Sequence, residues 1–82
     1  MPNRLKNGEK LVGVKQSSRA LSENRAALCY IAGDAEQRVT DPIKALCLER
    51  GVELVEVPTM AELGSCCGIE IGAAAAVLLR RK

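Results

Sequence analysis

The stretch LGSCCGIEIGAAAAVLL, residues 63–79, combines three spaced glycines, an adjacent cysteine pair and four consecutive alanines. Such a small, smooth and apolar segment is compatible with three functions. It can form a metal or redox site at Cys66 and Cys67, a membrane-associating helix, or a close-packed loop and strand that presents side chains to a partner. The rest of the sequence discriminates among these alternatives.

Length and composition predict one globular domain spanning residues 1–82, because 48% of the residues are hydrophobic and 27% are charged. Six basic and two acidic residues precede position 26, three basic and eight acidic residues follow up to position 79, and the sequence ends in Arg80-Arg81-Lys82. This asymmetry favours a local binding site for a polyanion, although solvated surface charge is the simpler explanation.

The longest uncharged run has nine residues, Ile71 to Leu79, which is less than half of a membrane span. The N-terminal residues are charged and show no signal-peptide pattern. We therefore expect a cytoplasmic protein with no membrane partner.

Short apolar runs alternate with helical patterns, which predicts an α/β fold. The Ala73–Leu79 run is ambiguous, since alanine favours helix while its length and position favour a buried strand; we interpret it as a strand. The predicted strands cover residues 11–14, 27–32, 52–57 and 73–79. Three helices are predicted: the first covers residues 15–24, the second begins at Asp41-Pro42 and stops at Gly51, and the third begins at Thr59.

Catalytic and metal-binding patterns are missing from the sequence. It has four cysteines, at positions 29, 47, 66 and 67, without a Cys-x-x-Cys pair, and it has no histidine to ligate zinc or activate a thiol. Phosphate-binding glycine loops and a nucleophile elbow are also absent from it. We predict no metal, no cofactor and no enzymatic activity, with the cysteines as packing residues.

The segment GVKQSSRAL, residues 13–21, carries the strongest signal for binding. Gly13 permits a tight turn into a helix, and Lys15, Gln16 and Arg19 then lie within about one turn of its N-terminus. Cations at the positive end of a helix dipole favour an anionic ligand such as phosphate, and Gln16 or Lys15 can also address base edges. The alternative is a solvated surface helix. Tyr30, the one aromatic residue, lies in a predicted central strand, so bases cannot be read by stacking on a sheet.

The segments GVKQSSRAL and ELGSCCGIEIGAAAA together resemble the kink-turn-binding ribosomal protein superfamily, whose archaeal prototype is L-seven-Ae, and most closely its small bacterial branch. The second segment follows the family pattern Leu-Gly-x-x-Cys/Val-Gly-Ile-Glu-Val. This resemblance implies a three-layer α/β/α sandwich with a mixed four-stranded sheet. It also implies a non-catalytic protein that binds kink-turns, which are RNA bulges flanked by sheared G·A pairs, in ribosomal or riboswitch RNA.

The resemblance also implies which residues touch the RNA. The G·A pairs are read from the segment after Gly13, by Lys15, Gln16 and Arg19, although archaeal members mostly carry Asn-Glu and Lys at these positions. The loop that packs on unstacked bulge nucleotides corresponds to Cys67, Gly68, Ile69, Glu70 and Ile71. We expect a monomer. The alternatives are a ribosome-associated or protein-binding adaptor on the same fold, and a thiol-reactive or metal-binding protein using Cys66 and Cys67.

Overall fold

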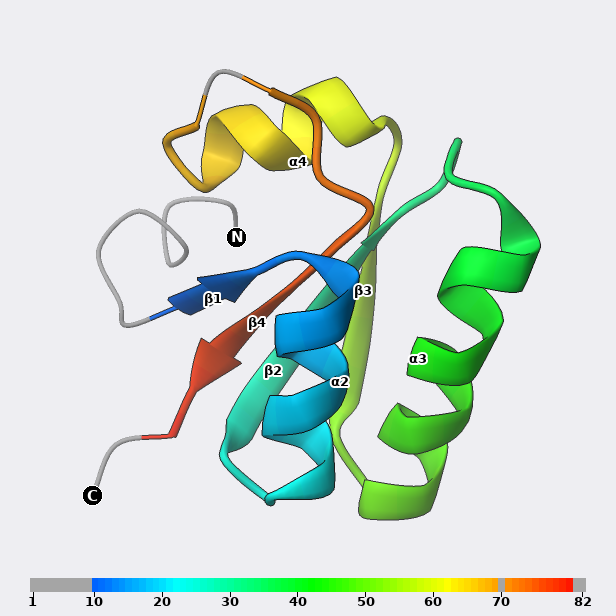
Figure 1. Cartoon of the computed structure of the whole chain (residues 1–82), viewed down its shortest axis with the longest axis vertical. Helices are drawn as coiled ribbons and strands as arrows, with labels where there is room; N and C mark the ends of the chain where they lie inside the picture. Colours follow the sequence, from blue (N-terminus) through cyan, green and yellow to red (C-terminus); the bar gives the residue numbers. More distant parts are fainter. Residues whose placement is uncertain (1–9, 70, 81–82) are drawn as a thin grey trace.

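The computed structural model describes residues 10–69 and 71–80 (Figure 1). Strands and helices alternate along the chain, as the apolar runs predicted. The elements are β1 (Lys10–Val12), α2 (Val14–Ser22), β2 (Ala26–Ala32), α3 (Gln37–Arg50), β3 (Glu53–Val57), α4 (Met60–Cys66) and β4 (Ala75–Leu79).

The strands form one mixed sheet in the order β1-β4-β2-β3. β2 runs parallel to β3, while β4 runs antiparallel to both of its neighbours, β1 and β2. The prediction that the alanine run forms a strand is confirmed from Ala75 onward. Its central position overrides the helix propensity of alanine, because sheet pairing on both sides satisfies its backbone.

Helices cover both faces of the sheet: α2 and α3 lie on one face and α4 lies on the other (Figure 1). β4 divides its side chains between the two cores. Ala75 and Val77 pack toward α2 and α3, whereas Ala76 and Leu78 pack on the side of α4. A strand held between two helix layers has no polar face, which explains its apolar sequence. The three-layer α/β/α sandwich is therefore confirmed.

The start of α3 was predicted wrongly. The helix begins at Gln37 rather than at Asp41, so Pro42 lies inside it. Two bonds build the earlier turn, because the N–H groups of Val39 and Thr40 both donate to the Glu36 carbonyl, at 3.0 and 3.2 Å. Thr40 is also buried. Pro42 cannot bond to the Arg38 carbonyl, but both residues are exposed, so water can satisfy that carbonyl.

The first helix spans Val14–Ser22 where residues 15–24 were predicted, and the two remaining predicted helix boundaries agree with the structure. α3 stops at Gly51, which adopts a left-handed conformation with φ 67°. α4 is capped by Thr59, whose Oγ1 accepts a hydrogen bond from the Glu62 N–H at 3.0 Å. None of the helices in the described ranges is long and apolar enough to cross a bilayer.

Candidate nucleic-acid interface

The turn between β1 and α2 is fixed to the start of β4. The Gly13 N–H donates to the Ala75 carbonyl at 2.8 Å, and the Gly13 carbonyl accepts from the Ser17 N–H at 2.9 Å. Gly13 has φ +114°, and a Cβ there would lie 2.7 Å from Oε1 of Gln16. Glycine is therefore favoured by the backbone conformation, and the end of the Gln16 side chain lies over the turn.

The N-terminal turn of α2 has the electrostatics of an anion-binding site. Lys15 and Gln16 are exposed, and one turn later the Arg19 side chain is 81% exposed. The turn contains no acidic residue and no side-chain cap. Its first N–H groups have no intrahelical acceptors and add to the positive potential. The structure thus exposes Lys15 and Gln16 at the positive end of α2, and Arg19 one turn further along, in the last turn of the helix.

The segment after α4 packs closely against that helix. The Ile69 N–H donates to the Gly64 carbonyl at 3.0 Å, and the Ala73 N–H donates to the Met60 carbonyl at 3.0 Å. A Cβ at Gly64 would overlap the Ile71 carbonyl oxygen and lie 3.2 Å from the Gly72 Cα. The small residues of this segment therefore allow its backbone to lie directly on α4.

The predicted residues of this segment differ in accessibility. Ile71 is 74% exposed, Gly68 is exposed with φ +81°, and Ile69 is half-buried against the core on the α4 side. Cys67 is only 4% exposed, so its side chain is a packing residue and offers no surface to a ligand. Glu70 lies outside the described residues.

The two predicted segments approach the same region of the fold. The loop from α4 leads into β4 (Figure 1), whose first residue is Ala75, and the Ala75 carbonyl is the group that anchors the Gly13 turn. A ligand seated on the N-terminus of α2 thus lies next to the backbone that continues into this loop.

Sequence reasoning missed Asp34, whose Oδ1 accepts a hydrogen bond from the Met60 N–H at 2.8 Å. This bond fixes the loop after β2 to the first residue of α4. Asp34 thus supports the position of α4 and of the loop that follows. The sequence offered no signal for a contact between residues so far apart.

The cysteines form the second chemical feature of the domain. All four are free and buried. Burial raises the pKa of the Cys29 thiol, and the adjacent Cys47 raises it further. Burial also raises the pKa of Cys47 and of Cys67, with Lys10 acting in the opposite direction on Cys67. Across residues 10–69 and 71–80, no three His, Cys, Asp or Glu side chains gather as a metal site.

We expect these thiols to be unreactive in the folded protein. A chromogenic disulfide reagent at pH 8 should titrate the native protein much more slowly than the protein in guanidinium chloride, because reaction requires an accessible thiolate. The raised pKa values of Cys29, Cys47 and Cys67 also mean that the contribution of these three thiols to stability is complete below their ordinary pKa, about 8.5, and is lost as the pH rises further. Rapid native titration at the adjacent pair would instead support a thiol-reactive function.

The fold and this surface define a small three-layer α/β/α domain with a basic helix end beside a glycine-rich loop. The chain belongs to the Ribosomal protein L7Ae/L30e/S12e/Gadd45 family, whose family model matches residues 1–81. The resemblance inferred from the sequence is thereby confirmed.

Relatives and a solved structure agree with this assignment. The chain is 46% identical over 68 residues to the RNA-binding protein TTE2299 of Caldanaerobacter subterraneus, covering 83% of each chain. It is 31% identical over 68 residues to the large ribosomal subunit protein eL8 of Halobacterium salinarum, covering 82% of this chain and 57% of that protein.

The fold matches the Giardia lamblia 15.5kD RNA binding protein with a TM-score of 0.85 at 21% identity, over 99% of this chain and 72% of that one. The names of the two sequence relatives, one an RNA-binding protein and the other a ribosomal protein, support the prediction that the chain is not an enzyme.

Proposed function

We propose that this protein is a non-catalytic RNA-binding protein that recognises kink-turns. The observation that carries the proposal is the exposed pair Lys15 and Gln16 in the acid-free first turn of α2, with the exposed Arg19 one turn further along the helix. The names of relatives such as TTE2299 provide independent support for RNA as the ligand.

The recognition mechanism follows from the shape of RNA. A regular A-form helix hides its base edges in a deep, narrow major groove, so a short helix reads them only where a bulge and non-Watson–Crick pairs widen that groove. Lys15 and Gln16, in the first turn of α2, then reach base edges by hydrogen bonds. The helix N–H groups and Arg19 attract phosphates.

The loop after α4 supplies an apolar contact beside the polar one. Ile71 is 74% exposed, and a bulged nucleotide presents an unstacked base that an aliphatic side chain can cover. The tight packing of the loop on Gly64 presents Ile71 without a large entropy loss on binding.

Substituting Ile71 by serine should weaken kink-turn binding about fivefold while leaving the melting temperature and the salt slope unchanged, because the lost contact is apolar and does not involve phosphate. Leu48→Ser is the matched control. Leu48 is 86% exposed on α3, away from the proposed interface, so its loss should not alter affinity. Equal effects of the two substitutions in fluorescence titrations would remove Ile71 from the site.

A protein-binding adaptor on the same fold is the alternative. It draws on exposed acidic residues of β3, Glu53 and Glu56, in a strand that has one partner in the described sheet. Cross-linking RNA to the protein in cells and sequencing it separates the two functions. We expect enrichment of RNAs with a bulge flanked by tandem G·A pairs, which a Lys15→Ala, Gln16→Ala, Arg19→Ala variant loses. Enrichment of proteins without such RNAs would favour the adaptor.

A further inference from the structure

The positive surface of α2 continues beyond Arg19. Nε of Arg19 lies 3.5 Å from one carboxylate oxygen of Glu23, and Nη1 of Arg25 lies 3.6 Å from the other. One carboxylate therefore holds two guanidinium groups at the C-terminal end of the helix. The side chains of Arg19 and Arg25 remain 81% and 57% exposed, so both are accessible to a ligand.

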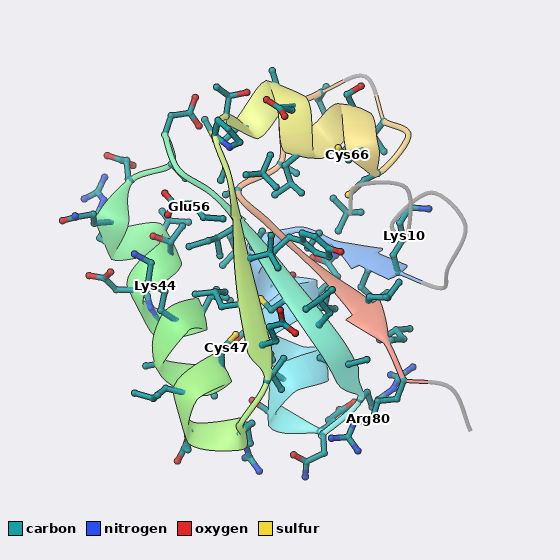
Figure 2. All side chains as sticks on the ribbon, turned by 180° about the vertical axis from the view of Figure 1, so that it is seen from behind. Lys10, Lys44, Cys47, Glu56, Cys66 and Arg80 are labelled. Carbon is teal, nitrogen blue, oxygen red and sulfur yellow. The ribbon has the colours of Figure 1, made fainter. Side chains whose placement is uncertain are left out.

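A third guanidinium reaches this place from the other end of the chain. The Arg80 N–H donates to the Arg25 carbonyl at 2.7 Å, and Nε of Arg80 donates to the Ala26 carbonyl at 3.5 Å. Figure 2 shows Arg80 where β4 ends, beside the turn that follows α2. The fold thereby joins the basic N-terminal part of the sequence to its basic C-terminal part.

These residues extend the basic surface along the whole of α2. Lys15 and Arg19 lie four positions apart on one helix face, Glu23 connects Arg19 to Arg25, and main-chain pairing connects Arg25 to Arg80. The nine residues of α2 span about 13 Å. The basic surface therefore extends beyond the first turn of α2, toward the C-terminal end of the helix.

The side chains of this basic surface are suited to binding phosphate rather than bases. Guanidinium groups present several N–H donors and bind phosphate oxygens readily. Tyr30, the chain's one aromatic residue, is buried and cannot stack an unpaired base here. An exposed ion pair such as Arg25–Glu23 is weak, so a phosphate oxygen can replace the Glu23 carboxylate as the partner of Arg25.

We infer that Arg25 and Arg80, next to Arg19, form a second phosphate-binding surface that holds the backbone of the RNA helix flanking the recognition site. The inference rests on the proposed function, which places the recognition site at the N-terminus of α2. The second surface raises the affinity for RNA and favours RNAs with a sufficiently long stem. It does not read base sequence, because phosphate contacts carry no sequence information.

The test uses three kink-turn RNAs: one with two short stems, and two in which one or the other stem is extended. Wild type should bind one extended RNA about fivefold to tenfold tighter than the short RNA, with a salt slope steeper by one to two units, since each phosphate contact adds about 0.9. Arg25→Gln and Arg80→Gln should each reduce that gain and leave affinity for the short RNA unchanged.

Arg38→Gln is the matched control, because Arg38 also forms an exposed ion pair, 3.5 Å from Glu36, but lies on α3. This variant should keep the full gain in affinity for the extended RNA. Equal wild-type affinity for all stem lengths, or equal losses in the three variants, would overturn the inference. A bulge-deleted short RNA tests the proposed function separately. If the bulge matters and the stem does not, only the second surface is wrong.

Discussion

Replacing Gly64 by alanine should lower the free energy of unfolding by about 2–3 kcal/mol, even though alanine is the better helix former by about 1 kcal/mol. The new Cβ would overlap the carbonyl oxygen of Ile71 and press on the Gly72 Cα at 3.2 Å. Both are backbone atoms, so the clash can be relieved only by moving the loop away from α4. Urea denaturation measures the effect.

Ser65→Ala is the matched control for the Gly64 substitution. Ser65 is the next residue of α4 and is exposed, so alanine there changes helix propensity without creating a contact. It should be neutral or slightly stabilising. If Gly64→Ala proves as stable as Ser65→Ala, the loop does not pack on α4 as the structure describes.

The second large effect concerns recognition. Lys15→Ala and Gln16→Ala should each weaken kink-turn binding by about 1–3 kcal/mol, or roughly fivefold to 150-fold, if their side chains pair with base edges. Affinity for the same RNA without the bulge should change much less. Lys44→Ala removes an exposed lysine of α3 and controls for general charge loss. Losses that are the same for both RNAs would reassign Lys15 to phosphate contact.

Arg19→Ala distinguishes between two roles for Arg19. A phosphate contact predicts equal weakening of both RNAs and a salt slope lower by about 0.9, whereas a base contact predicts the behaviour of Gln16→Ala. Its pairing with Glu23 in the free protein directs the guanidinium toward the C-terminal end of α2, which favours the phosphate role.

Local patterns were sufficient to predict most of the fold. The strands β2 and β3 and the caps at Gly51 and Thr59 depend on neighbouring residues, and the structure confirms them. The start of α3 was missed because its deciding feature is tertiary. Burial of Thr40 and the bonds to the Glu36 carbonyl outweigh a proline that would otherwise open the helix.

The candidate site also contains residues that the sequence could predict and residues that it could not. Lys15, Gln16 and Arg19 follow a recognisable turn, and the structure leaves them exposed. The glycine-rich loop has no periodicity, so the sequence could not separate the exposed Ile71 from the buried Cys67. Contacts such as Arg80 with Arg25 join residues from the two ends of the chain, and no local pattern encodes them.

Recognition of kink-turns is tested by titrating the wild-type protein with a kink-turn RNA and with the same helix lacking the bulge, each at two salt concentrations. We expect at least about tenfold tighter binding to the bulged RNA. We also expect this ratio to persist at the higher salt, because base-edge and apolar contacts release no counterions. Equal affinity for the two RNAs at both salt concentrations would rule out kink-turn recognition and leave Lys15 and Arg19 as solvated surface charges.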